Sequence, residues 1–148
     1  QLYTFGAPGR DPRGRVVTVA YMALVSAPIT ASAGSDAADV RWWPVDKLPK
    51  LAFDHRQILR YARERLRYKL EYSNAAWSLL PEKFTLSELQ GVYETAWGRK
   101  MDKRNFRKKI LALGLLQSIR EKRRGLHQRP AQLHVFKTKK KVELKRFF

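Results

Sequence analysis

Residues 85–136 decide the fold of the C-terminal part of the chain, and they read TLSELQGVYETAWGRKMDKRNFRKKILALGLLQSIREKRRGLHQRPAQLHVF. Thr85 and, three residues later, Glu88 form a capping-box pattern, which is typical of the start of a helix. We expect this helix to end at Gly98, because glycine readily adopts the left-handed conformation that closes a helix. A tight turn over residues 99–101 should follow. The buried face of the helix is expected to consist of Leu86, Leu89, Tyr93 and Ala96.

A second helix is predicted directly after this turn. Asp102 is a residue type that caps helix N-termini, and Gly114 stands where a C-terminal cap is expected. Between them, apolar residues recur at helical spacing and predict a buried stripe formed by Phe106, Ile110 and Leu113.

Two strands are predicted after the second helix, at residues 115–119 and 131–136, with a basic loop over residues 120–130 between them. A short helix is expected earlier, over residues 73–80, and ends before Pro81. A short helix, a helix, a tight turn, a helix and a β-hairpin make up the winged helix-turn-helix.

The second helix of such a motif enters the major groove of duplex DNA. Arg104 and Lys108 lie opposite the buried stripe, with Arg107 and Asn105 on the two flanks. Arginine can donate two hydrogen bonds to guanine and asparagine can pair with adenine, whereas lysine suits phosphates. The basic loop is expected along the backbone or in the minor groove. The candidate DNA-binding residues are Lys100, Lys103, Arg104, Asn105, Arg107, Lys108, Arg123, Arg124 and Arg129.

The net charge supports a polyanionic partner, because 31 Lys and Arg face 13 Asp and Glu, giving +18. This charge is uneven, since residues 1–52 carry a net +2 and residues 53–148 carry +16. Nucleic acid is the first expectation and an anionic membrane surface the second. A basic amphipathic helix can also be merely a solvated face. The chain has no cysteine, and no apolar run approaches the length of about 20 residues that spans a membrane.

The N-terminal part predicts strands and loops followed by a long helix. Residues 1–5 are expected to be extended, residues 6–14 to form a loop, residues 15–25 a mostly buried strand, and residues 26–39 a mobile loop. Asp54 and Gln57 suggest a capping box at the start of the long helix. Its apolar positions are Ile58, Ala62, Leu66 and Leu70.

Two pairs of segments resemble known families. TFGAPGRDPRGRVVTVAYMALV (residues 4–25) and RWWPVDKLPKLAFDHRQILRYARERLR (residues 41–67) resemble the C-terminal half of a Nudix domain of the ADP-ribose pyrophosphatase type. DKRNFRKKILALGLL (residues 102–116) and RPAQLHVFK (residues 129–137) resemble the winged helix of Nudix-related transcriptional regulators of NAD metabolism. The expected fold is α+β. It has a partial Nudix-like mixed sheet (residues 1–52), a connecting helix (residues 53–72) and a winged helix-turn-helix domain (residues 73–148).

The resemblance also implies a function. It implies a bacterial repressor that binds, as a homodimer, a palindromic operator of NAD or pentose metabolism genes. It also implies that ADP-ribose or a related nucleotide releases the repressor from DNA. The protein is then expected in the cytoplasm, at the nucleoid. The candidate effector-binding residues are Arg10, Asp11 and Arg13. Phe53, Asp54 and His55 would lie where the ligand signal reaches the DNA-binding domain.

Two alternatives remain open, a fragment of a Nudix nucleotide pyrophosphohydrolase and an RNA-binding module. The Nudix box GX5EX7REUXEEXGU, which holds magnesium in active enzymes, does not occur in residues 1–148. We therefore expect no hydrolysis by this chain and assign no catalytic residue and no cofactor. The three histidines, His55, His127 and His134, are too far apart in sequence to suggest a metal site. Residues 1–52 are expected to be partly disordered, exchanged between protomers or paired with a further segment.

Overall fold

The structure, a computed structural model, describes residues 1–144 apart from positions 28, 31, 33, 35–38 and 124–129. Much of the loop expected at residues 26–39 and the tip of the basic loop therefore lie outside the described residues. The chain divides into an N-terminal unit, Gln1–Arg65, and a C-terminal unit, Leu66–Phe148. The division falls inside helix α1 (His55–Tyr72), so one continuous helix contributes residues to both units.

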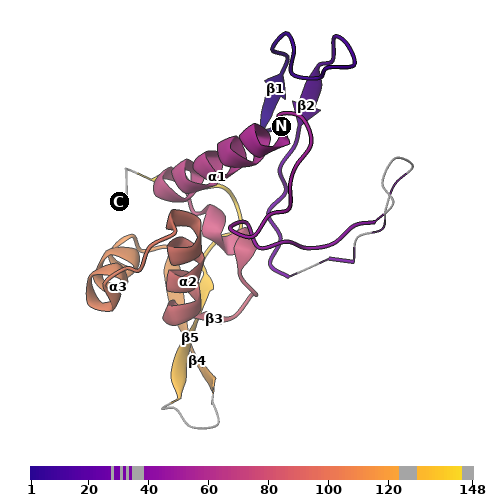
Figure 1. Cartoon of the computed structure of the whole chain (residues 1–148). Coiled ribbons are helices and arrows are strands. Elements are labelled where there is room, and N and C mark those ends of the chain that lie inside the picture. Colours follow the sequence, from indigo (N-terminus) through magenta and orange to yellow (C-terminus); the bar gives the residue numbers. More distant parts are fainter. Residues whose placement is uncertain (28, 31, 33, 35–38, 124–129, 145–148) are drawn as a thin grey trace. The chain divides into compact units, whose positions relative to one another are not determined.

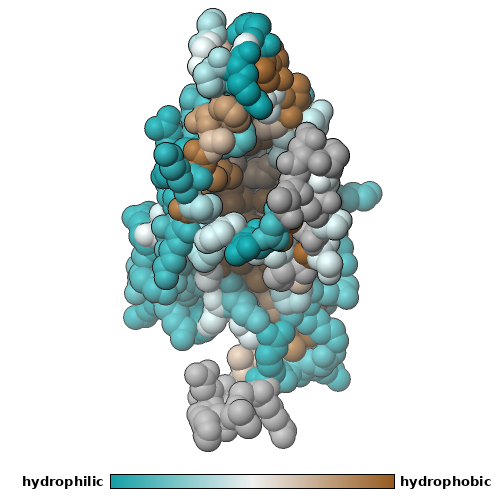
Figure 2. Space-filling model, turned by 45° about the vertical axis from the view of Figure 1, so that its right-hand side comes forward, coloured by the Kyte–Doolittle hydropathy of each residue, from teal (hydrophilic) through white to brown (hydrophobic). Residues whose placement is uncertain are grey.

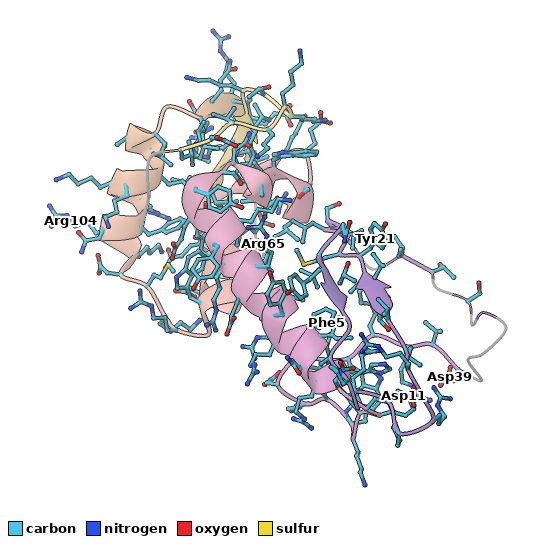
Figure 3. All side chains as sticks on the ribbon, turned by 90° about the horizontal axis from the view of Figure 1, so that it is seen from above. Phe5, Asp11, Tyr21, Asp39, Arg65 and Arg104 are labelled. Carbon is cyan, nitrogen blue, oxygen red and sulfur yellow. The ribbon has the colours of Figure 1, made fainter. Side chains whose placement is uncertain are left out.

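Aromatic side chains hold the N-terminal unit together. Strands β1 (Tyr3–Phe5) and β2 (Thr18–Ala20) pair in antiparallel fashion. Phe5 is buried, and its ring centroid lies 5.9 Å from that of Tyr61 on α1 (Figure 3). The ring of Tyr3 lies 5.0 Å from the same tyrosine. Both rings of the hairpin thus pack against the first half of α1.

The strand expected at residues 15–25 is shorter and more exposed than its apolar sequence predicts. Only Thr18–Ala20 is a strand, and Val17 is 56% exposed, Val19 48% and Tyr21 75%. Figure 2 shows brown apolar patches at the end that carries β1 and β2. A two-stranded hairpin has too small a face to bury a full strand of side chains. Of the mixed Nudix-like sheet, the described residues form these two antiparallel strands.

The C-terminal unit has the predicted order of elements. The 3-10 helix η1 (Ala75–Leu79) and strand β3 (Phe84–Thr85) lead to helix α2 (Leu86–Trp97), helix α3 (Lys103–Ala112), strand β4 (Leu116–Arg123) and strand β5 (Ala131–Phe136). The strands form an antiparallel sheet in the order β3-β5-β4. Figure 1 shows the β4–β5 hairpin projecting past the N-terminal end of α2. The winged helix-turn-helix and the α+β class are confirmed.

The predicted caps of α2 and α3 are confirmed. The Thr85 hydroxyl accepts a hydrogen bond from the Glu88 backbone at 3.2 Å, and the Glu88 carboxylate accepts one from the Thr85 backbone at 2.7 Å. α2 ends at Gly98, which has a left-handed φ of 65°. Asp102 accepts a hydrogen bond from the Asn105 backbone at 2.7 Å. The sequence thus fixes both ends of the turn between α2 and α3.

The core of the C-terminal unit centres on Tyr93. Its ring centroid lies 5.4 Å from Phe106 of α3 and 5.5 Å from Trp97. Leu70 and Leu89 are fully buried nearby in the same unit. Burial raises the pKa of the Tyr93 hydroxyl above its usual range. The last part of α1, from Leu66, therefore shares one core with α2 and α3 in the C-terminal unit.

The segments around residues 73–80 and 137–144 differ from expectation. The expected helix at 73–80 is a shorter 3-10 helix, because the Asn74 side chain binds the C-terminal segment instead of capping. Its amide donates to the Lys140 carbonyl at 3.0 Å and its oxygen accepts from the Val142 backbone at 2.9 Å. The Leu144 backbone also donates to the Tyr72 carbonyl at 2.7 Å. The segment is held against the end of α1.

Strand β4 is longer than predicted, since it runs to Arg123 instead of ending at Ile119. Its register with β5 shifts between Ser118 and Lys122. In the part of the chain that the structure describes, no helix is both long and apolar enough to cross a membrane.

The packing of α3 gives a first prediction. Phe106 is 1% exposed and Leu111, on the same helix, is 48% exposed. Phe106→Ala should lower the free energy of unfolding by about 3–5 kcal/mol because it leaves a cavity against Tyr93. Leu111→Ala should cost less than about 1 kcal/mol. Urea denaturation followed by tryptophan fluorescence measures both, and equal losses would show that α3 does not pack by the Phe106 face.

Candidate nucleic-acid interface

Helix α3 has five exposed polar or basic side chains, and Arg104 and Lys108 among them lie opposite its buried residues. Phe106 and Ile110 are buried, which turns the opposite face outward. Figure 3 shows Arg104 on the outward side of the helix. The exposed residues of the predicted set on this helix are Lys103, Arg104, Asn105 and Lys108. Their geometry allows contact with the edges and phosphates of a groove that admits a helix.

Arg107, also in the predicted set, lies in a different setting. It is half-buried, and its Nε is buried without a hydrogen-bond partner among the described residues. The Nδ1 of His134 on β5 is also buried without a hydrogen-bond partner among the described residues. Burial lowers the pKa of His134, the Gln132 backbone opposes this, and the charge of Arg107 adds to the lowering. Arg107 is therefore less open to a ligand than Arg104.

The turn between α2 and α3 is held by Glu94, which the sequence analysis did not single out. Its carboxylate accepts hydrogen bonds from the Met101 backbone at 2.9 Å, from Lys100 at 3.0 Å and from Gln90 at 2.9 Å. Gln90 also donates to the Met101 carbonyl at 2.9 Å. These bonds, led by the Met101 backbone N–H, lower the pKa of Glu94 to about 2. These hydrogen bonds cross a turn, so the helical periodicity of the sequence does not predict them.

Lys100 joins this network but stays open, since its side chain is 93% exposed and pairs with Glu94. Its ammonium can approach a phosphate while it remains near the turn. The predicted residue is thus at the surface, in the turn that precedes α3.

Arg123 on β4 is engaged within the protein. Its guanidinium pairs with Glu88 and donates to the Lys83 carbonyl at 3.0 Å. Burial works to raise the pKa of Glu88, but hydrogen bonds from Thr85 and the charge of Arg123 outweigh it and lower the pKa. Arg123 therefore ties the hairpin to the start of α2, and its side chain is 46% exposed. Arg124 and Arg129 lie outside the described residues.

The three predicted effector-binding residues lie together in the N-terminal unit. Arg10 donates to both carboxylate oxygens of Asp54, at 2.8 and 2.7 Å, and to the Thr18 hydroxyl at 2.8 Å. Its side chain is 5% exposed. The Gln57 backbone N–H donates to the Asp54 backbone carbonyl at 2.8 Å, and the capping box expected from Asp54 and Gln57 stays a prediction. Arg10 also lowers the pKa of Asp54.

Asp11 and Arg13 form a second pair in the same loop. The Arg13 side chain donates to the Asp11 carboxylate at 2.7 Å, which is the main reason that the pKa of Asp11 falls to about 2. Arg13 is 73% exposed, and its guanidinium lies 4.7 Å from the ring centroid of Phe53. Of the three residues, Arg13 is the one most open to an anionic ligand.

Phe53 has a left-handed backbone conformation, with φ 49°, which bulky residues rarely adopt. It directly precedes Asp54 and lies under Arg13, so the loop and the start of α1 meet at this strained residue. In the described ranges, no three His, Cys, Asp or Glu side chains gather to hold a metal ion.

A capped helix-turn-helix with an exposed basic second helix, followed by an antiparallel hairpin, defines the class of winged helix-turn-helix proteins. Residues 76–136 match the family model described as the NrtR DNA-binding winged helix domain. The chain is similar to Shewanella oneidensis NrtR, at 39% identity and a TM-score of 0.75, covering 100% of this chain and 68% of that chain. The chain belongs to the NrtR family, and the resemblance drawn from the sequence is confirmed.

Three further proteins are similar to this chain, in agreement with this family. A crystal structure of Shewanella oneidensis NrtR complexed with a 27mer DNA matches at 38% identity and TM-score 0.73, over 93% of this chain and 63% of that chain. The ADPR responsive transcriptional repressor NtrR of Acinetobacter baylyi is 35% identical over 138 residues, which is 92% of this chain and 55% of the repressor. A MutT/nudix family protein from Enterococcus faecalis matches at 28% identity and TM-score 0.65, over 93% and 61% of the two chains. The chain thus spans about half the length of the curated repressor.

The Glu94 network gives a second prediction. Its folded-state pKa of about 2 lies below the ordinary 4.5, so its stabilising effect is present above pH 4.5 and lost as the pH falls toward 2. A carbon NMR titration of the Glu94 carboxylate should have its midpoint near the lower value. Glu94→Gln should be less stable than the unchanged protein at pH 6 and equally stable near pH 2. A midpoint near pH 4.5 would show that the turn is not held by Glu94 in solution.

Proposed function

We propose that this protein is a ligand-responsive transcriptional repressor that reads a palindromic duplex DNA operator with α3. The observation that carries the proposal is the exposed face of α3, where Arg104 and Lys108 stand opposite the buried Phe106 and Ile110 and Asn105 is exposed on the flank. A crystal structure of the related Shewanella oneidensis NrtR complexed with a 27mer DNA supports duplex DNA as the ligand. The uneven charge adds an electrostatic attraction that favours the C-terminal unit.

The proposed DNA contact of each residue follows from its position in the structure. Arg104 and Asn105 contact base edges, whereas Lys100, Lys103 and Lys108 contact phosphates. Arg107 supports α3 and reaches the groove from its half-buried position. Arg123, Arg124 and Arg129 bring the hairpin to the backbone, with Arg123 also anchoring β4 to Glu88.

The effector is proposed to be ADP-ribose or a related nucleotide, bound near Arg13 in the N-terminal unit. The related Acinetobacter protein is named an ADPR responsive repressor, and an exposed guanidinium stacked on Phe53 suits a pyrophosphate next to an aromatic ring. Arg10 and Asp11 shape the loop through their pairs with Asp54 and Arg13. The operator symmetry calls for a homodimer. The proposed setting is the bacterial cytoplasm, at the nucleoid, on NAD or pentose metabolism genes.

A Nudix pyrophosphohydrolase is the second candidate, supported by the likeness to a MutT/nudix family protein. Release of ribose 5-phosphate from ADP-ribose with magnesium would favour it. We propose that this chain has no such activity, since residues 1–148 contain no Nudix box.

The first test is selection of bound duplexes from a random DNA library at near-physiological salt, with and without ADP-ribose. A repressor should yield a palindromic consensus that is lost when ADP-ribose is added. Binding without any consensus that fades with salt would overturn the proposal and leave only non-specific attraction. Tighter binding of structured RNA than of the selected duplex would favour an RNA-binding module.

Arg104→Ala tests the proposed reading residue. It should cost about 1–3 kcal/mol on the selected duplex and relax the preference at one base pair, because a bidentate contact is lost. The matched control is Arg41→Ala, which removes the same charge from the N-terminal unit, where Arg41 pairs with Asp39. Kd values on a panel of single-base operator variants measure both. An equal loss on every duplex would make Arg104 a phosphate contact.

A further inference from the structure

The C-terminal end of α2 is closed by a residue of another helix. The last carbonyls of any α-helix lack partners within the helix. In α2 two of them accept hydrogen bonds from Arg67 of α1, the Ala96 carbonyl from Nε at 2.7 Å and the Trp97 carbonyl from Nη2 at 3.4 Å. A cation at this end also interacts favourably with the helix dipole.

Arg67 also lies against the residue at which the chain leaves α2. A Cβ added to Gly98 would come within 3.8 Å of the Arg67 Nη2. Gly98 adopts the left-handed conformation, and the Arg99 backbone donates to the Glu94 carbonyl at 3.3 Å. The guanidinium thus packs beside the bend that leads into α3.

The position of Arg67 on α1 is itself fixed. Leu70, one turn further along the helix, is completely buried, and the Tyr93 hydroxyl donates to its carbonyl at 3.4 Å. Arg67 is half-buried. Because its backbone is anchored in the core, the guanidinium is a fixed support for the end of α2.

Two supports therefore hold the turn, one at each of its ends along the chain. Arg67 holds the last carbonyls of α2, whereas Glu94 and Gln90 hold Met101 just before α3.

We infer that Arg67 is a positioning residue for DNA reading: its guanidinium fixes the end of α2 so that α3 meets the major groove in one orientation, and it does not itself contact DNA. The inference rests on the proposed function. It assigns a role in recognition to a basic residue outside the helix-turn-helix.

The test compares Arg67→Ala and Arg67→Lys with Arg63→Ala in the whole chain. Arg63 is exposed on the same helix and carries the same charge. Affinity for the selected duplex and for a random duplex is measured at several salt concentrations. Amide hydrogen exchange at residues 99–103 is measured in the free protein.

Arg67→Ala should weaken binding of the selected duplex about tenfold, the effect of losing a charge-assisted hydrogen bond. It should leave the random duplex and the slope of log Kd against log salt unchanged, because the phosphate contacts remain. Exchange at residues 99–103 should become about tenfold faster. Arg67→Lys keeps the charge on a single donor nitrogen, so its affinity and exchange rate should lie between those of Arg67→Ala and the unchanged protein. Arg63→Ala should change neither the specificity of binding nor the exchange rate.

A salt slope reduced by about one unit would make Arg67 a phosphate contact and overturn the inference. Unchanged exchange at the turn would overturn it as well. If the unchanged protein selects no duplex, the proposed function fails and DNA positioning fails with it. The exchange data then decide separately whether Arg67 holds the turn.

Discussion

The rest of the C-terminal unit depends on the packing of Tyr93. Its ring contacts Phe106 and Trp97, and its hydroxyl reaches the Leu70 carbonyl. One side chain of α2 thereby joins α1 and α3 in a single core. This burial turns Arg104 and Lys108 of α3 toward solvent, since a helix that buries one stripe must expose the opposite one. The candidate DNA-binding face is therefore a consequence of the core.

A core alone leaves the angle between two helices only loosely fixed, and polar contacts complete the arrangement. Glu94 and Gln90 bind Met101 across the turn, Arg67 binds the last carbonyls of α2, and the pair of Arg123 and Glu88 joins β4 to the first turn of the same helix. Each contact satisfies a backbone or carboxylate group that helix ends and turns would otherwise leave open. Both ends of α2 are thus tied to neighbouring elements.

The N-terminal unit follows a different principle, because charge pairs and a small aromatic cluster around Tyr61 take the place of a large core. Arg10 and Asp54 link the loop to α1, and Arg13 pairs with Asp11 while it stacks on Phe53. Val17, just before β2, and Val19 within it stay exposed in the same unit. The sequence correctly placed Arg10, Asp11 and Arg13 in one loop. It did not reveal that Arg10 is committed to Asp54, 44 residues away.

The amino-acid pattern alone specifies the elements of the winged helix-turn-helix, the caps at Thr85, Gly98 and Asp102, and the outward face of α3. All of these depend on local spacing, which the chain carries within a few residues. Which charged residues are exposed and which are bound to other groups follows only from the folded chain. Arg104 is exposed, whereas Arg67, Arg10 and Arg123 bind groups distant in sequence. Such pairings arise only when folding brings separate segments together, so no periodicity in the sequence records them.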